Sequence, residues 1–172
     1  QGVLLSAAPR TMKPRRIIIG FVILAILGTS YLLWRSSPEQ TVKRQAHQLL
    51  GCLEKGALSR TTPSEKADLL VGLLAPTFKV QAPYPVDSGS FNPIQAAQSL
   101  RDFHNSVMSC AISKENPLVN LQSDKSGRYE VTLSVEISLG PRRRHHLKYQ
   151  CLIEFIENGE GWLAREIILN PI

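Results

Sequence analysis

A long apolar segment near the N-terminus constrains the fold more than any other feature of this chain. Residues 17–34 carry no charged side chain over eighteen consecutive positions. As an α-helix they would be about 27 Å long, close to the roughly 30 Å hydrocarbon core of a bilayer. The segment therefore predicts a transmembrane helix at 17–35, in contact with the lipid bilayer through residues 17–34. It joins a short N-terminal segment at 1–16 to a domain at 36–172.

Basic residues on the two sides of this segment predict its orientation. Lys13, Arg15 and Arg16 precede it, whereas Arg35 alone follows it. Basic residues accumulate on the cytoplasmic side of membrane-spanning helices. We therefore expect a cytoplasmic N-terminus and a periplasmic or extracellular C-terminal domain. The basic leader that begins at Met12 favours a bacterial inner membrane.

A cleaved signal peptide is the alternative to a permanent anchor. The small residues 28–30 would then form the cleavage site. The apolar run continues through residues 31–34, however, and ends on Tyr and Trp side chains of the kind enriched at membrane interfaces. These residues favour the anchor. Residues 1–11 carry no recognisable pattern and contribute nothing to the predicted fold.

The net charge of +6 comes from the surroundings of the apolar segment. Five of the twenty Lys and Arg residues lie in the segment from Arg10 to Arg35. The rest of the chain holds the other fifteen together with fourteen Asp and Glu residues, so its net charge is small. A nearly neutral domain offers no basic stripe to a phosphate backbone. Nucleic acid is therefore excluded as a partner.

Three helix starts share one sequence pattern. Ser37-Pro38, Thr62-Pro63 and Asn92-Pro93 are each followed by the Glu or Gln that completes a capping box. The capping side chain accepts a backbone N–H, proline at the first helical position wastes no donor, and Glu or Gln reaches back to the cap. The pattern predicts three amphipathic helices, of which the first ends near Gly56 and the second before Pro76.

From about residue 117, apolar residues recur at every second position, which predicts half-buried strands. The long runs are 129–139 and 147–155, a last strand covers 162–169, and shorter strands are expected near 77–82 and 118–122. Glycine- and proline-rich turns between the long runs predict an antiparallel meander.

This order of helices and strands resembles the nuclear transport factor 2-like superfamily, which includes SnoaL-like proteins, over residues 38–172. The resemblance implies an α+β fold, a cone-like domain of three helices packed on a curved antiparallel sheet. The superfamily includes isomerases, dehydratases, polyketide cyclases, transport adaptors and membrane-anchored subunits of secretion systems. Fold membership alone therefore does not select a function.

Enzymes of that superfamily use inward Asp, His or Tyr side chains between the helices and the sheet. Here the inward positions of the two long strands offer only the phenols of Tyr129 and Tyr149 and a thiol. His104 and His47 lie at the borders of apolar helix faces and are the candidate general bases, but neither has a partner to orient its ring. A half-buried, hydrogen-bonded histidine is therefore the favoured interpretation of both residues. We assign no catalytic residue and no cofactor.

A basic run, Arg142 to Arg144, marks the turn between the two long strands, with Lys148 close behind. It would contact anionic lipid head groups or an acidic partner. A solvated turn whose charge protects one end of the sheet is the slightly favoured interpretation. His145 and His146 point to opposite faces of a strand, so they predict no metal site.

Apolar residues on the expected outer face of the sheet indicate an interface. Leu152 and Ile156 alternate with polar residues, and Ile167 lies in the apolar row of the last strand. Superfamily members dimerise or dock partners through this face, which implies a homodimer or a protein complex of the cell envelope. A register shift that turns one of these rows inward is the alternative.

Three cysteines outside the cytoplasm permit one internal disulfide. Cys52 and Cys110 would be the pair, because the first and third predicted helices are expected to pack together. Buried free thiols are nevertheless the default expectation.

Two functions remain open. The first is a membrane-tethered, non-enzymatic interaction or assembly module of the cell envelope, which the anchor, the apolar inward face and the missing acid–base pair favour. The second is a binder of small hydrophobic ligands, or a lyase or isomerase, that uses His104 or Tyr149 in a pocket between helices and sheet.

Overall fold

The computed structural model describes residues 37–56, 61–83 and 88–172, and all of these from Pro38 onwards belong to one unit, Pro38–Ile172. The predicted transmembrane helix at 17–35 lies outside the described residues. Within them, no helix is both long and apolar enough to cross a membrane.

Three helices begin at the prolines of the predicted capping patterns. They are α2 (Pro38–Leu53), α3 (Pro63–Leu73) and α4 (Pro93–Ser106). In α3 the Thr62 hydroxyl accepts from the Glu65 N–H, and the Glu65 carboxylate accepts from the Thr62 N–H. Asn92 and Gln95 form the same box at the start of α4. These two capping boxes confirm the sequence pattern.

Six strands form one sheet in the order β2-β1-β6-β5-β4-β3. They are β1 (Leu74–Gln81), β2 (Gly89–Phe91), β3 (Ser109–Ser123), β4 (Ser126–Gly140), β5 (Arg143–Glu157) and β6 (Trp162–Pro171). All neighbouring strands are antiparallel except β1 and β6, which run parallel. The predicted antiparallel sheet is therefore wrong in this respect, and the sheet is mixed.

Prolines explain where the strand boundaries differ from the prediction. β3 begins directly after α4 and runs through Pro117, where Asn116 has a positive φ of 53° and the pairing with β4 shifts register. β1 begins before Pro76, and its pairing with β6 also shifts there. Proline has no N–H for a ladder and is tolerated at bulges and edge strands. Both strands therefore look shorter in the sequence than they are, and the three-residue β2 leaves no recognisable alternation.

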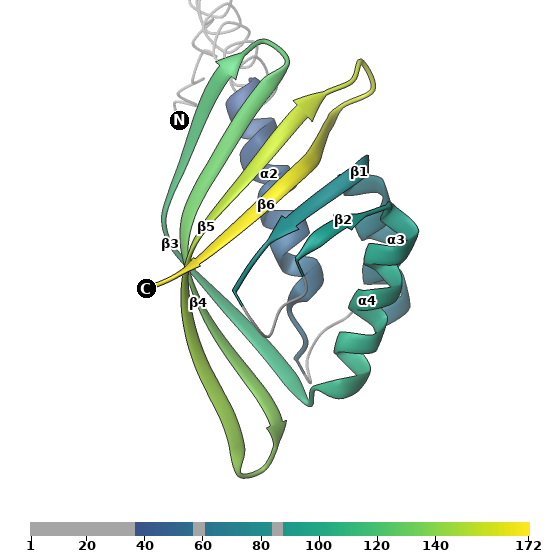
Figure 1. The fold of residues 1–172 in the computed structure, drawn as a ribbon, viewed down its shortest axis with the longest axis vertical. Helices are drawn as coiled ribbons and strands as arrows, with labels where there is room; N and C mark the ends of the chain where they lie inside the picture. Colours follow the sequence, from purple (N-terminus) through teal and green to yellow (C-terminus); the bar gives the residue numbers. More distant parts are fainter. Residues whose placement is uncertain (1–36, 57–60, 84–87) are drawn as a thin grey trace, which may run out of the picture. The chain divides into compact units, whose positions relative to one another are not determined.

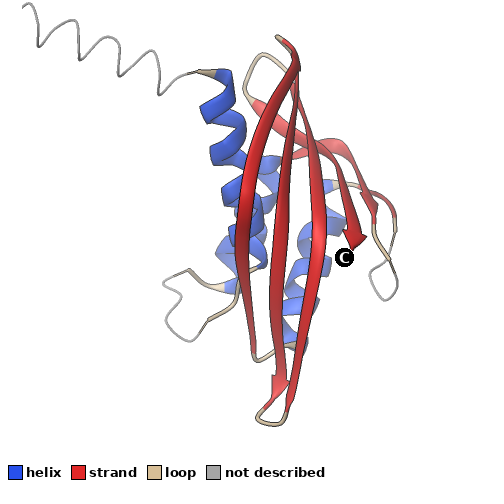
Figure 2. Cartoon of the chain, turned by 90° about the vertical axis from the view of Figure 1, so that its left-hand side faces the viewer, coloured by secondary structure: helices blue, strands red, loops and turns tan. Residues whose placement is uncertain are grey.

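All three helices cover one face of the curved sheet, as Figures 1 and 2 show. We call this the helix-facing side and the opposite one the outer face. Leu50 of α2 and Tyr129, Ile153 and Phe155 of the central strands are at most 1% exposed and belong to one apolar cluster. The predicted inward positions in the middle of β4 and β5 are therefore confirmed, and side chains fill the space between α2 and the sheet.

Candidate functional site

The four predicted pocket residues do not share a pocket. His47 is exposed on α2, with its ring edge-on to Tyr129 at a centroid distance of 6.0 Å. Tyr149 is buried further along the sheet, on β5. Of the four, only His104 lines a cavity, which opens near the ends of the helices and is described below. The structure therefore does not assemble these side chains into one acid–base site.

The polar groups inside the core are held in their neutral forms. Burial raises the pKa of Tyr129 to about 12, and burial raises the pKa of the Cys151 thiol to about 12 as well. The Tyr129 hydroxyl has no hydrogen-bond partner among the described residues. Neither group ionises near neutral pH, so neither is suited to act as a base or nucleophile there.

Cys52 and Cys110, the pair considered for a disulfide, are both buried free thiols, which is the default expectation from the sequence. Cys110 lies on β3. Its backbone forms an isolated antiparallel bridge with Lys55, which follows the end of α2. Burial raises the pKa of both thiols, that of Cys110 to about 11. The two cysteines act as small apolar core residues.

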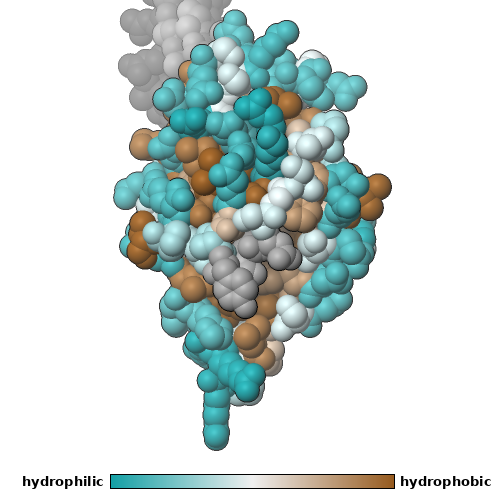
Figure 3. All heavy atoms as spheres, in the orientation of Figure 1, coloured by the Kyte–Doolittle hydropathy of each residue, from teal (hydrophilic) through white to brown (hydrophobic). Residues whose placement is uncertain are grey.

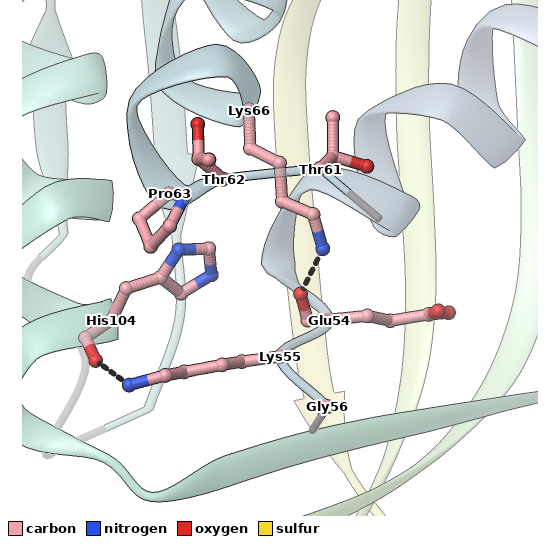
Figure 4. Close-up of a pocket in the computed structure, with 8 residues that line it drawn as sticks. All are labelled: Glu54, Lys55, Gly56, Thr61, Thr62, Pro63, Lys66 and His104. Carbon is pink, nitrogen blue, oxygen red and sulfur yellow. Dashed lines mark hydrogen bonds between the residues drawn. The ribbon is translucent and has the colours of Figure 1, made fainter. Parts of the chain in front are cut away.

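A cavity of about 260 Å³ opens where three helices end or begin (Figure 4). It is lined from the C-terminal side of α2, the start of α3 and the last turns of α4, by Glu54, Lys55, Gly56, Thr61, Thr62, Pro63, Lys66 and His104. His104 is 1% exposed. Its Nε2 lies 3.4 Å from the Leu53 carbonyl oxygen, whereas its Nδ1 is buried without a partner in the described part of the chain.

Two lysines flank the imidazole in this cavity. Lys55 Nζ donates to the carbonyl oxygens of His104 and Val107, and Lys66 Nζ donates to that of Glu54. Burial lowers the pKa of His104, and the charges of both lysines lower it further, against hydrogen bonds to backbone carbonyls that raise it. His104 is therefore neutral near pH 7.

The sequence did not predict these lysines, because neither belongs to a catalytic or metal-binding pattern. A usable signal was present in α3, where Lys66 precedes Leu70 by four positions and so lies on the same apolar face of the helix. Lys66 is 9% exposed. A lysine on the buried face of an amphipathic helix marks a place where an ammonium group has to be satisfied.

Strand register decides which predicted interface residues face outwards. Leu152 lies opposite Ile168, and Ile156 lies opposite Leu163, and all four are half-buried on the outer face. Ile167 lies opposite the buried Ile153 and is 7% exposed, so its predicted place in the interface is wrong.

A bulge explains the position of Ile167. Phe155 pairs with Ala164, but the preceding Glu154 pairs with Glu166, which leaves Arg165 as an extra residue in β6. One extra residue in a strand of period two turns every following side chain to the other face.

Ion pairs lie between these aliphatic residues on the outer face. Glu154 contacts Arg128 of β4 at 2.9 Å and Arg165 of β6 at 2.8 Å. Hydrogen bonds from Arg165 and Arg128 lower the pKa of Glu154. Lys148 and Arg144 lie 3.7 Å from Glu115 and Glu136, respectively. The charges of this face are thus largely satisfied within the sheet.

The basic turn lies at the tip of a projecting hairpin. β4 and β5 extend past the helices, so Leu139 and Leu147 near the tip are 44% and 38% exposed. Figure 3 shows that the end of the hairpin, which carries Arg142 to Arg144, is hydrophilic. Figures 1 and 2 both place this tip at the opposite end of the unit from the first turn of α2.

No model of a known protein family matches the chain, and no curated protein matches it either. Solved structures do resemble it. One is an NTF2-like protein with a cystatin-like fold from Novosphingobium aromaticivorans, with a TM-score of 0.61 and 14% identity over 87% of this chain and 90% of that chain.

Two further structures are similar in the same way. A proposed dehydratase of the NTF2-like family from Streptomyces avermitilis has a TM-score of 0.62 and 12% identity over 78% of this chain and 95% of that one. A CaMKII hub from S. rosetta has a TM-score of 0.59 and 10% identity over 80% and 98%. The unit Pro38–Ile172 therefore has the NTF2-like, cystatin-like α+β fold. At these identities the likeness defines the fold and not the activity.

Proposed function

We propose that this unit is a non-enzymatic interaction module, tethered to a membrane by residues 17–34, that pairs with a second copy of itself through the outer face of the sheet. The observation that carries the proposal is the pattern of that face. Two cross-strand aliphatic pairs, Leu152 with Ile168 and Ile156 with Leu163, flank the Arg128–Glu154–Arg165 cluster.

Such a face is self-complementary. By register, its acidic residues are Glu115, Glu130, Glu136, Glu154 and Glu166, and its basic residues are Lys79, Arg128, Arg144, Lys148 and Arg165. Equal numbers of both signs leave this face without a net charge that would repel a second copy, and a two-fold axis uses the same surface patch on both subunits. The aliphatic pairs supply apolar area, while the paired charges form the polar surroundings.

The basic hairpin fits a different contact. If residues 17–34 span the membrane, the lipid surface lies near the first turn of α2, since only three residues separate the segment from Pro38. The tip with Arg142 and Arg143 lies at the opposite end of the unit from that turn. This arrangement favours an acidic protein segment over lipid head groups as its partner.

The alternative function, a binder of hydrophobic ligands or a lyase or isomerase, has less support. The space between α2 and the sheet is filled by buried side chains such as Tyr129 and Phe155. The cavity that His104 lines has two ammonium groups beside the ring, which suits a charged ligand better than an apolar one. Among the described residues that line it, only Glu54 carries a carboxylate, and this carboxylate is turned to Lys114 rather than to the imidazole.

The proposal is tested by changing one leucine on each side of the unit. Leu152→Asp places a charge in the centre of the outer face, whereas Leu69→Asp makes the same change at a 45% exposed position of α3. With the full chain in mild detergent, light scattering should show a dimer for the wild type and Leu69→Asp. Leu152→Asp should dissociate at least about tenfold more readily.

Circular dichroism melting of both variants controls for folding. A monomeric wild-type chain, or a folded Leu152→Asp variant that associates as tightly as the wild type, would contradict the proposal.

A further inference from the structure

Strand β5 is covered by β6 along only part of its length. The pairing of β5 with β6 runs as far as Tyr149, opposite Pro171. One further hydrogen bond joins the Ile172 N–H to the Lys148 carbonyl oxygen. Figure 1 shows that β5 continues beyond this point to the tip of the hairpin, with β4 on one side. Residues 143–147 therefore form a free edge, which no described strand pairs with, and we call it the β5 edge.

The backbone directions on the β5 edge follow from hydrogen bonds on either side of it. The Lys148 carbonyl oxygen accepts from the residue after β6, so the backbone groups of Lys148 point away from β4. These groups alternate in direction along a strand, so those of His146 and Arg144 point the same way. The β4 side agrees, because Ser138, which lies opposite Arg144, turns its carbonyl oxygen to the Met108 N–H on the side away from β5. Arg144 and His146 therefore each present an N–H and a C=O at the β5 edge.

The side chains of the β5 edge are basic near the tip and apolar at the other end. Residues 143–146 are two arginines and two histidines, all exposed, and Leu147 is 38% exposed. Arg144 has an ion pair with β4 at 3.7 Å, whereas Arg142 and Arg143 have none among the described residues. These two arginines border a hollow of about 400 Å³ at the tip, whose other lining residues are Leu139, Gly140 and Pro141. A segment laid along the β5 edge therefore meets unpaired cations at one end and an aliphatic side chain at the other.

Charge selects the kind of segment that fits this edge. A second copy that paired through the same edge would place its arginines against these, because a two-fold axis uses the same residues on both subunits. Like charges on neighbouring strands are destabilising, and basic residues are a common protection of exposed edges against self-association. The same residues attract an acidic strand. A lipid head group offers acceptors to the arginines, but it lacks the alternating donors and acceptors that pair with a strand.

We infer that the β5 edge binds an acidic, extended segment of a partner protein, which adds to the sheet as a short strand. The backbone of this segment pairs with Arg144 and His146. Its carboxylates lie beside Arg142 and Arg143, and an aliphatic side chain packs beside Leu147. In strand addition, main-chain hydrogen bonds supply affinity and side-chain contacts supply specificity. The inference rests on the proposed interaction function, to which it adds a partner, but it does not need the outer-face dimer.

Amide hydrogen exchange at two neighbouring histidines tests strand addition directly. The His146 N–H points to the free edge, whereas the His145 N–H points to β4 and serves as an internal control. The full chain in mild detergent, labelled with ¹⁵N-histidine, is titrated with a short capped peptide of Glu and Val residues. Saturation should slow exchange of the His146 amide at least about tenfold and leave that of His145 unchanged. The absence of saturable binding, or unchanged exchange at His146 on saturation, overturns the inference.

Two altered peptides separate backbone pairing from charge attraction. A peptide with N-methyl groups on alternate residues keeps every side chain but cannot donate to the edge, so it should bind at least about tenfold more weakly. Equal binding of this peptide would contradict strand addition. A peptide with Lys in place of Glu should not bind, and equal binding would contradict an acidic partner.

The same signals report the other possible occupants. Protection of the His146 amide that develops on raising the protein concentration alone would assign the edge to a second copy. Displacement of the peptide by phosphatidylglycerol in the micelles, at a lower concentration than by unlabelled peptide, would assign it to lipid head groups. Either result overturns the inference.

A pair of variants at one position tests the backbone contact. His146→Pro removes the N–H that faces the free edge, where proline is tolerated because that N–H has no partner strand. It should weaken binding of the labelled peptide at least about tenfold, measured by fluorescence anisotropy. His146→Ala keeps the N–H and should bind within about twofold of the wild type. Undiminished binding by a folded His146→Pro variant would place the peptide elsewhere and overturn the inference.

Charge variants locate the peptide on the molecule. Arg143→Glu should weaken binding about tenfold, whereas Lys125→Glu makes the same change at the exposed turn between β3 and β4 and should bind like the wild type. Equal effects of the two would contradict the assigned edge. Leu152→Asp, the variant that tests the dimer, should also bind like the wild type, so failure of the dimer and failure of the β5 edge are distinguishable. Loss of binding by a folded Leu152→Asp variant would place the peptide on the outer face and overturn the inference.

Discussion

The two faces of one sheet differ in how they satisfy their side chains. On the helix-facing side, Val131, Cys151 and Ile153 are fully buried in an apolar cluster. On the outer face, Glu154 directly follows Ile153 in β5 and forms ion pairs with Arg128 and Arg165 between half-buried aliphatic residues. Both faces are built by the same alternation, so a side chain's role is decided by register alone.

This difference indicates which parts of the molecule are available for binding. The NTF2-like fold often leaves room between helices and sheet, but here bulky side chains occupy that space and the buried polar groups are un-ionised. The charged side chains lie outside this core, on the outer face, on the hairpin tip and at the helix ends.

The sharpest test of the comparison uses two neighbouring isoleucines. Ile167→Asp buries an unpaired charge and should reduce the free energy of unfolding by more than about 3 kcal/mol, because Ile167 is 7% exposed against Ile153. Ile168→Asp places the same charge on the outer face and should cost less than about 1 kcal/mol. Urea unfolding followed by circular dichroism measures both, and equal losses would show that the bulge at Arg165 is misplaced.

A pair of glycines extends the comparison to packing. A Cβ on Gly127 would lie 3.2 Å from atoms of both Leu121 and Val42, so Gly127→Ala should cost about 1–3 kcal/mol through overpacking. Gly140→Ala, at the hairpin end of the same strand, meets no atom within 4 Å and should change stability by less than about 0.5 kcal/mol. Thermal melting of both variants gives the contrast, and a neutral Gly127→Ala would show that this corner is loosely packed.

The outer-face ion pairs predict a dependence on acid. Glu154→Gln should lower stability at pH 7 by about 1 kcal/mol, a modest loss because Arg128 and Arg165 are 34% and 51% exposed. The pKa of Glu154 is lowered in the folded state, so its contribution is complete above the ordinary carboxylate range and disappears as the pH falls through the lowered value.

The corresponding measurement is urea unfolding at pH 7 and pH 3. The difference between wild type and Glu154→Gln should shrink on acidification. Glu160→Gln, which removes a carboxylate without an ion pair among the described residues, should show no such difference at either pH. A constant gap between wild type and Glu154→Gln would contradict the assigned role.

The smallest effect is expected inside the core. Tyr129→Phe removes a buried hydroxyl that has no hydrogen-bond partner among the described residues. Its removal should leave the free energy of unfolding within about 0.5 kcal/mol of the wild type or raise it slightly, since no hydrogen bond is lost. A loss of more than about 1 kcal/mol in urea unfolding would show that the hydroxyl is satisfied in solution.

Local signals in the sequence predicted the local structure well. The capping boxes at Thr62 and Asn92 place two helix starts, and the alternation in β4 and β5 identifies the central core residues. Both signals depend on neighbours within one turn or one strand. The α+β class followed from their order.

Long-range features were harder to predict. The parallel pairing of β1 with β6 joins distant parts of the chain, and no local pattern encodes it. The bulge at Arg165 inverts the face of Ile167 without changing the alternation enough to be noticed. The cavity at the helix ends combines three elements, so Lys55 and Lys66 gain their meaning only once the helices are packed.

The two edge strands of the sheet limit how this protein can assemble. One edge strand, β2, is three residues long, and the other, β3, is interrupted in its middle by Pro117 and the left-handed Asn116. Neither offers the unbroken row of backbone donors and acceptors that an incoming strand requires. Growth into open-ended fibres by strand addition is therefore disfavoured at both edges, and association through a face stops once that face is covered.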